Sequence, residues 1–108
     1  MEARRLYEQS PEQYFKPDQY NNPANPLAHY HTTAPEIWQQ TDGQVEVFLD
    51  FVGTAGTYTG VMRYLRSMNP HIRGYVVEPR GAAVLAGRCV SNASHKIQGG
   101  GYSMDELP

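Results

Sequence analysis

The pattern of hydrophobic and polar positions is clearest in the middle of the chain. In Val45–Val52, apolar residues occupy both alternating sets of positions and only Glu46 and Asp50 interrupt them. A strand that is covered on both faces, as in a parallel sheet, has this pattern. Thr57–Met68 instead repeats apolar residues every three or four positions, which predicts an amphipathic helix. The apolar run Ile72–Val77 predicts a second strand, and the three segments together predict a βαβ unit with a right-handed crossover.

The N-terminal part of the chain predicts two more helices with a loop between them. Good helix formers fill Glu2–Gln9, and Ser-Pro follows at once, so a short helix is expected to end there. The run Asp18–Pro26 is rich in proline and asparagine and predicts an ordered loop. Thr33 suits the N-cap of a helix that ends near Gln40, because Glu36 stands where a capping box requires it.

Three shorter signals complete the predicted organisation. Tyr14–Lys16 is a candidate extended segment, Asp42-Gly43 is a turn signal, and Ala82–Leu85 is a candidate short helix. The fold class predicted is therefore α/β, with a small, mainly parallel sheet and flanking helices. We expect a single partial domain made of three segments: a helix–loop–helix segment at 1–42, the βαβ unit at 43–79 and a glycine-rich segment at 80–108.

The residues best suited to chemistry lie between the first predicted strand and the helix that follows it. Gly53, Thr54, Ala55, Gly56 and Thr57 form this connection. The first N–H groups of a helix have no intrahelical acceptor, and the helix dipole places partial positive charge at the same point. Glycines admit close approach of an anion, and threonine hydroxyls can add hydrogen bonds, so the segment suits a phosphate. It contains no Gly-Lys-Ser/Thr of a Walker A loop, and on these residues alone phosphate binding and a packing role are equally open.

Composition and charge restrict the other classes of function. The 108 residues suffice for one small domain, the net charge is -2 and the basic residues are scattered, so no nucleic-acid partner is expected. Cys89 is the only cysteine, which excludes a disulfide within the chain. No apolar run approaches the roughly 20 residues that span a bilayer. We expect a cytoplasmic protein that does not associate with membranes.

The four histidines do not predict a metal site. His29 and His31 are two positions apart, and no third ligand stands at a spacing that would complete a site with them. His71 and His95 are isolated. We interpret all four as hydrogen-bonded structural residues, and no serine or cysteine lies in the context of a catalytic nucleophile.

Several motifs together resemble the cysteine synthase and cystathionine β-synthase family. They occur in the family's order and spacing over nearly the whole chain, in Asp18–Tyr30, Thr32–Trp38, Val52–Gly60, Val77–Pro79 and His95–Gly99. The resemblance implies a fold-type II pyridoxal-phosphate enzyme with two α/β domains and the cofactor between them. It also implies an activity, replacement of the β-substituent of serine or O-acetylserine by sulfide or homocysteine, between which the sequence does not choose.

The resemblance also assigns roles to individual residues. Gly53–Thr57 would hold the phosphate of pyridoxal 5'-phosphate. Gln19 matches a glutamine that lies near the carboxylate of the amino-acid substrate. The glycine-rich stretch that lines the cleft is matched by Gly99, Gly100, Gly101 and Tyr102.

The sequence departs from the family pattern in two respects. Ala55 stands where the family usually has glycine, and its methyl group would crowd the phosphate if that backbone position has a positive φ. The segment with the lysine that forms the imine with the cofactor has no counterpart, and Lys16 and Lys96 match non-catalytic positions. The Ser/Thr-Gly-Asn substrate loop and the hydroxyl partner of the pyridine nitrogen have none either.

These departures predict a fragment of a β-replacement enzyme that is not catalytic alone, so no catalytic residue is assigned. We expect it to self-associate or to associate with the missing segments. The alternative is a small non-enzymatic protein derived from that fold, which binds an anion or pairs with another copy or a full-length relative through exposed apolar surface.

Overall fold

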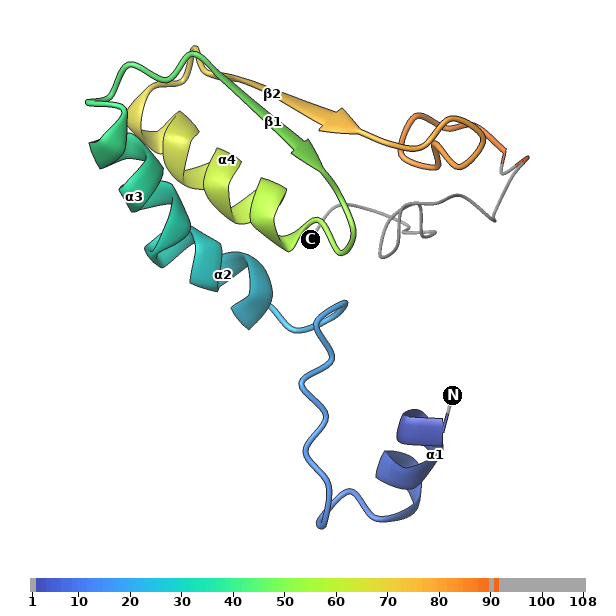
Figure 1. The fold of residues 1–108 in the computed structure, drawn as a ribbon. Helices are drawn as coiled ribbons and strands as arrows, with labels where there is room; N and C mark the ends of the chain where they lie inside the picture. Colours follow the sequence, from blue (N-terminus) through green and yellow to red (C-terminus); the bar gives the residue numbers. More distant parts are fainter. Residues whose placement is uncertain (1, 90, 92–108) are drawn as a thin grey trace.

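The computed structural model describes residues 2–89 and 91. Along this part of the chain, helices cluster on one side of a small sheet, and an N-terminal arm extends away from them (Figure 1). The elements follow in the order α1 (Glu2–Gln9), α2 (Ala24–His31), α3 (Thr33–Gln40), β1 (Val47–Phe51), α4 (Gly56–Met68) and β2 (Arg73–Val77).

The two strands confirm the predicted parallel pairing. β1 and β2 run parallel, with Val47 opposite Arg73 and Phe51 opposite Val77, and α4 connects them. The fold is therefore α/β, a small parallel two-stranded sheet with flanking helices, as predicted. β1 is shorter than the predicted Val45–Val52, since its pairing with β2 begins at Val47.

The core forms where α4 faces the sheet and α3. The predicted apolar stripe of α4 is buried at Val61, Met62 and Leu65, which pack with Ala34 and Ile72. Met68, the last residue of the predicted stripe, is exposed at the end of the helix. Full burial of such side chains contributes about 1.5–3 kcal/mol each, so α4 is the element that organises this small fold.

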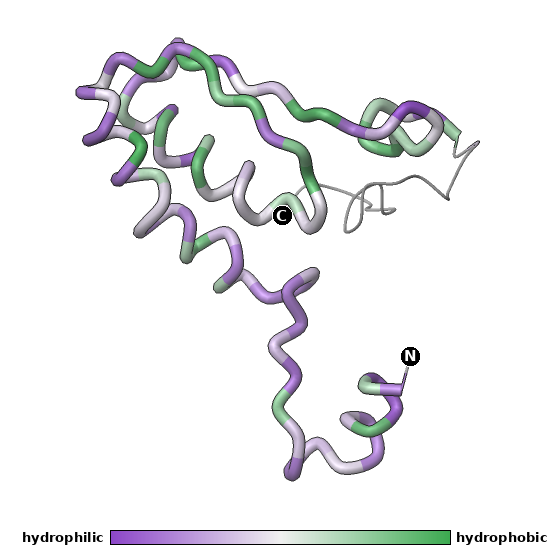
Figure 2. The backbone as a smooth tube through the Cα atoms, in the orientation of Figure 1, coloured by the Kyte–Doolittle hydropathy of each residue, from purple (hydrophilic) through white to green (hydrophobic). Residues whose placement is uncertain are grey.

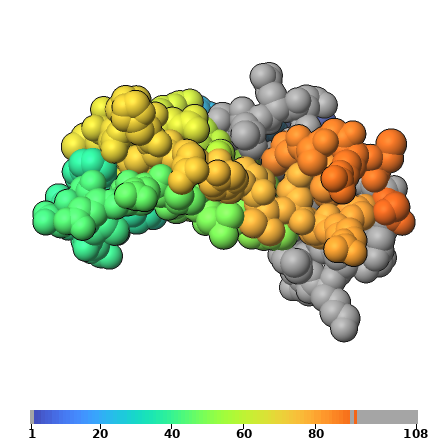
Figure 3. Space-filling model, turned by 90° about the horizontal axis from the view of Figure 1, so that it is seen from above, coloured from blue at the N-terminus to red at the C-terminus, as the bar shows by residue number. Residues whose placement is uncertain are grey.

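The two faces of the sheet have different environments. Phe48 packs against the core, and a Cβ atom at Gly74 would collide with Met62 on α4. The opposite face carries Leu49, 63% exposed, with Tyr75 and two valines also exposed beside it. In Figure 1 the helices lie on one side of the strands, and Figure 3 shows both strands at the surface of the other side. The prediction that both faces of β1 are covered is therefore wrong for the described residues.

The predicted loop Asp18–Pro26 ends earlier than expected, because α2 begins at Ala24. Pro26 is the third residue of this helix, where the missing N–H group would have had no intrahelical acceptor. Asn22 closes the preceding turn by accepting a hydrogen bond from the N–H group of Ala24 at 3.0 Å. The prediction of a loop through Pro26 is wrong because proline is tolerated in a first helical turn.

The bounds of α3 agree with the prediction, but its cap does not. The N-cap is Thr32, and its hydroxyl donates to the carbonyl of Ala28 at 2.7 Å instead of capping α3. Thr33 lies inside the helix, and its hydroxyl contacts His29. The predicted capping box does not form because Thr32 is the single residue between α2 and α3. Its hydroxyl completes the last turn of α2.

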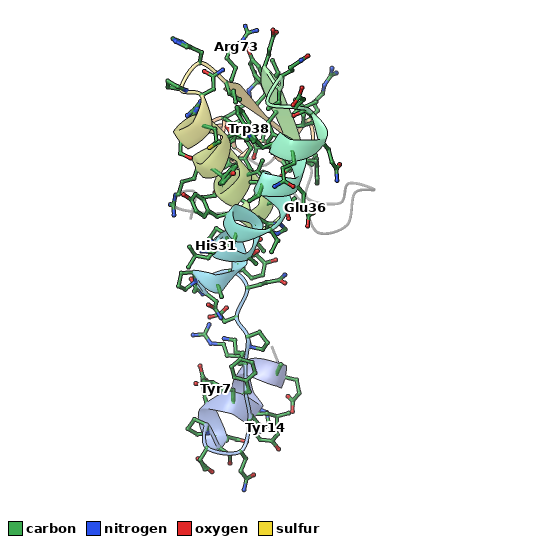
Figure 4. The ribbon with its side chains drawn as sticks, turned by 90° about the vertical axis from the view of Figure 1, so that its left-hand side faces the viewer. Tyr7, Tyr14, His31, Glu36, Trp38 and Arg73 are labelled. Carbon is green, nitrogen blue, oxygen red and sulfur yellow. The ribbon has the colours of Figure 1, made fainter. Side chains whose placement is uncertain are left out.

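The N-terminal arm confirms the predicted helix α1 and little else of that region. α1 has no buried residue, and polar residues predominate along the arm (Figure 2). Tyr14–Lys16 forms no strand, and Phe15 is 86% exposed. Figure 4 shows Tyr7 and Tyr14 on this arm, well separated from Trp38 in the helical body.

The segment after β2 contains turns where a helix was predicted. The carboxylate of Glu78 accepts hydrogen bonds from the N–H groups of Leu85 at 3.0 Å and Ala86 at 3.1 Å. Gly81 and Gly87 both have positive φ. The prediction of a helix at Ala82–Leu85 is wrong because these backbone donors are satisfied by a side chain and the flanking glycines reverse the chain.

Two further predictions concern short features. The predicted turn at Asp42-Gly43 is confirmed, with φ of 53° and 68°. Among residues 2–89 and 91, no helix combines the length and apolar character needed to cross a membrane.

Candidate functional site

The candidate site is the turn from β1 into α4. α4 begins at Gly56, and its first N–H groups point out of the N-terminal end of the helix, where the helix dipole is positive. The first turn of α4 contains no acidic residue that would neutralise this charge. The hydroxyl oxygen of Thr54 lies 3.4 Å from the Gly56 nitrogen, a long contact that leaves this donor weakly bonded. The first turn of α4 therefore has weakly bonded donors that suit an anion, and Gly56 itself is buried.

Ala55 meets the condition that the sequence raised for this position. It is the N-cap of α4 and has the left-handed conformation, with φ 64° and ψ 9°. This conformation costs a residue with a side chain roughly 1–2 kcal/mol, a cost that glycine does not have. Ala55 is only 3% exposed, so its methyl group is enclosed by the surrounding protein. The departure from glycine thus strains the backbone.

Asn25 connects the turn to the beginning of α2. Its side-chain nitrogen donates to the hydroxyl oxygen of Thr54 at 2.8 Å and to the carbonyl of Gln19 at 3.0 Å. One side chain therefore joins two of the residues that the resemblance singled out, although no motif in the sequence indicated this function for Asn25. Because Thr54 accepts this hydrogen bond, its own hydroxyl proton remains available to a ligand.

Two glycines let α2 lie close against α4. A Cβ atom at Gly56 would collide with the side chain of Asn25, and one at Gly60 would collide with the carbonyl of Pro26. The two glycines are four residues apart and so lie on the same face of the helix. This spacing is the signal in the sequence that could have revealed the contact between the helices.

His29, on α2, connects this helix to α3 and α4. Its Nε2 atom lies 3.2 Å from the Thr57 hydroxyl on α4, and its Nδ1 atom lies 2.9 Å from the Thr33 hydroxyl on α3. The interpretation of His29 as a hydrogen-bonded structural residue is thus confirmed. Within residues 2–89 and 91, no three His, Cys, Asp or Glu side chains come together as metal ligands.

Asp50, on β1, has a shifted pKa and interacts electrostatically with His29. Burial raises the pKa of the Asp50 carboxyl, while a hydrogen bond from the Phe51 N–H group and the positive charge of a protonated His29 act in the opposite direction. The charged carboxylate is therefore disfavoured where β1 packs against the helices.

The predicted site residues fall into two groups. Thr54 and the backbone of Gln19 come together through their hydrogen bonds to Asn25, and Gly56 lies against the same side chain. The predicted cleft residues Gly99, Gly100, Gly101 and Tyr102 lie outside the described residues. The donors at the turn, namely the N–H groups at the start of α4 and the Thr54 hydroxyl, match the acceptor oxygens of a phosphate group.

Comparison with known proteins identifies relatives over most of the chain. The profile of the family "Pyridoxal-phosphate dependent enzyme" matches residues 1–107. Cysteine synthase 3 of Caenorhabditis elegans is 56% identical over 82 residues, which are 76% of this chain and 24% of that protein.

Solved structures give the same result. A cysteine synthase from Entamoeba histolytica superimposes with a TM-score of 0.84 and 40% identity, over 93% of this chain and 29% of that one. An O-acetylserine-dependent cystathionine β-synthase from Helicobacter pylori superimposes with a TM-score of 0.79 and 40% identity, over 89% of this chain and 30% of that one. The chain thus spans about a quarter to a third of the length of these relatives.

Proposed function

Because the chain belongs to the pyridoxal-phosphate-dependent enzyme family, in its cysteine synthase-like, fold-type II branch, we propose that Gly53–Thr57 binds the cofactor phosphate. The observation that carries this proposal is the hydrogen bond of 2.8 Å from Asn25 to Thr54 at the start of α4. This bond orders the turn before a ligand arrives and directs the Thr54 hydroxyl proton away from Asn25. A preordered donor set lowers the entropic cost of binding.

The cofactor would be held mainly by backbone donors. The N–H groups of Gly56 and Thr57 and the hydroxyls of Thr54 and Thr57 would contact the phosphate oxygens. When bound, pyridoxal phosphate supplies the electron sink for chemistry at an amino acid. Gln19 and the stretch Gly99–Tyr102 would lie on the amino-acid side, as the resemblance implies. The role of this segment is then to bind and orient the cofactor.

The activity that we propose is that of the whole enzyme to which such a segment belongs. Two of the relatives are a cysteine synthase and an O-acetylserine-dependent cystathionine β-synthase. This chain would supply the phosphate-binding segment of an enzyme that replaces the β-substituent of serine or O-acetylserine. Neither Lys16 nor Lys96 matches the family's imine-forming lysine. The 108-residue chain mixed with cofactor, O-acetylserine and sulfide should thus give no turnover above free cofactor, and turnover would contradict this proposal.

The binding proposal can be tested with a cofactor analogue that cannot form an imine. Pyridoxine 5′-phosphate lacks the aldehyde, and pyridoxine lacks the phosphate as well, so their affinities isolate the phosphate contribution. We expect the chain to bind the first and not the second, with Thr54→Val weakening binding about fivefold, the effect of roughly one hydrogen bond. The control Thr41→Val removes a hydroxyl at the end of α3, distant from the turn along the chain. Equal affinity for both compounds, or no effect of Thr54→Val, would contradict phosphate binding here.

A second proposal concerns association and is favoured by the exposed face of the sheet. Val47, Leu49, Tyr75 and Val77 expose apolar side chains side by side on β1 and β2, in a family where helices normally cover both faces of a parallel sheet. We propose that this face pairs with a second copy or with further segments of the enzyme fold. Sedimentation should show concentration-dependent association that Leu49→Lys reduces and Phe15→Lys, on the arm, does not. A monomer at high concentration would contradict self-association.

A further inference from the structure

The two hydrogen bonds of His29 are coupled through its ring. Nδ1 contacts the hydroxyl of Thr33 at 2.9 Å, and Nε2 contacts the hydroxyl of Thr57 at 3.2 Å. A neutral imidazole carries a proton on one nitrogen and accepts a hydrogen bond at the other. One threonine therefore donates to the ring while the other accepts from it, and the tautomer decides which.

The two arrangements differ at the start of α4. With the proton on Nε2, Thr57 accepts from the ring, and its own hydroxyl proton is free for another acceptor. With the proton on Nδ1, Thr57 donates to Nε2 and can offer only lone pairs to its surroundings. An anion at the helix N-terminus is attracted by the first arrangement and repelled by the second.

We infer that His29 is a positioning residue that determines whether Thr57 donates its hydroxyl proton to the anion at the start of α4. This inference rests on the proposed binding of a phosphate by Gly53–Thr57. Thr33 supports this arrangement, because its hydroxyl donates to Nδ1 whenever Nε2 carries the proton. Binding of a phosphate therefore selects one tautomer of a ring that does not itself contact the ligand.

Two substitutions at His29 separate this role from simple packing. In His29→Gln, the side-chain amide reaches the position of Nε2 and can donate to Thr57. In His29→Asn, the shorter amide reaches the position of Nδ1, so it contacts Thr33 and leaves Thr57 without a partner. Each variant retains one tie between helices, but only the first sets the direction of the Thr57 hydroxyl.

The experiment is a titration of the full chain with inorganic phosphate at about pH 8, above the range in which an imidazole ordinarily takes up a second proton. The ¹⁵N shifts of the His29 ring report the tautomer directly. We expect phosphate to increase the Nε2–H form of the wild-type ring. We also expect His29→Gln to bind phosphate within about twofold of the wild type, and His29→Asn to bind about fivefold more weakly, the effect of roughly one hydrogen bond.

The outcomes distinguish this inference from the proposal on which it rests. If the wild type binds phosphate at the turn and its ring nitrogens do not change, the phosphate site stands and the role of His29 is refuted. Equal affinity of His29→Asn and wild type would refute it too. If the wild type does not bind phosphate, both proposals fail. Should His29→Asn not fold, the ring tautomer of the wild type alone decides the question.

Discussion

Helices α1 and α4 differ at their N-termini, because of the two only α4 has a first turn without an acidic residue. In α1 the first turn contains Glu2, whose carboxylate pairs with Arg5 on the same helix. In α4 the first turn contains no acidic residue, so the positive end of its dipole is not neutralised locally. A helix end is thus available to an external anion only when the sequence leaves it without an acidic side chain of its own.

The two helices also differ in how they are held. α1 buries no residue, and its ion pair between Arg4 and Glu8 at 2.8 Å is exposed, so it contributes little. α4 buries Val61 and Leu65 and receives α2 against Gly60. An isolated helix of eight residues is marginal in water, whereas packing fixes the first turn of α4 in one position. We infer that the packing of α2 against α4 holds the turn before α4 in one geometry, and that this fixed geometry makes the turn a candidate site.

The largest expected effect comes from separating α2 and α4. A methyl group in Gly60→Ala would collide with the backbone carbonyl of Pro26, which cannot move without displacing α2. We expect a loss of about 3 kcal/mol in the free energy of unfolding, the upper range for overpacking, measured by urea denaturation. Arg63→Ala, at an exposed position of the same helix, is the control and should change little. A Gly60→Ala variant as stable as this control would contradict the close contact.

Removing the side chain that ties the turn to α2 should have the next largest effect. Asn25→Ala deletes the bonds to Thr54 and Gln19. We predict a loss of about 1–2 kcal/mol in the free energy of unfolding and weaker binding of pyridoxine 5′-phosphate. Asn21→Ala, which removes an exposed bond to Asp18, should leave that affinity unchanged. Equal affinities of the two variants would show that Asn25 does not order the site.

Relieving the backbone strain in the turn should stabilise the protein. Ala55→Gly removes the cost of the left-handed conformation, and we expect a gain of about 1 kcal/mol in the free energy of unfolding. Ala28→Gly, at an exposed position inside α2, should instead lose about 1 kcal/mol. Thermal unfolding of both variants measures the difference in sign. Destabilisation by Ala55→Gly would mean that the positive φ is not required there.

A smaller effect is expected from the partly buried carboxyl of Asp50. Its pKa is raised mainly by burial, so the native state binds a proton more readily than the unfolded chain. Stability should therefore rise as the pH falls toward the ordinary range of an aspartate. Asp50→Asn should stabilise the protein at neutral pH, and this gain should disappear in acid. Unfolding curves at several pH values would show it, and a gain independent of pH would contradict the burial effect.

The smallest effect should follow from breaking an ion pair on α1. Glu8→Gln removes the partner of Arg4 on α1, a helix that has no buried residue. We expect the midpoint of unfolding of the helical body to be unchanged, because α1 contributes no core residue. A clear shift of the midpoint would mean that α1 contributes to the stability of the helical body although none of its residues is buried.

The elements with strong periodicity could be predicted from the sequence, and the tertiary contacts could not. The apolar stripe of α4 and the parallel pairing of its flanking strands follow from local patterns that packing reinforces. The beginning of α2 within a proline-rich run depends on Pro26 falling in a first turn, which propensity does not reveal.

The position of the candidate site could be predicted from the sequence, but the contacts that hold it could not. A strand–glycine–helix turn indicated an anion site, but the hydrogen bonds of Asn25 and His29 join residues about 30 positions apart. Such contacts depend on how helices cross, so neither spacing nor composition predicts them. The positive φ of Ala55 could be raised only as a condition, because alanine seldom adopts it.

The central claim, that the start of α4 is the phosphate site of this chain, can be tested by mapping phosphate binding on the backbone. In a ¹⁵N-labelled sample titrated with inorganic phosphate, we expect the largest amide shifts at Gly56, Thr57 and Tyr58, and none in α1. Shifts at Arg4 and Arg5 with none at the start of α4 would show binding to surface charge alone. That result would contradict the proposed site.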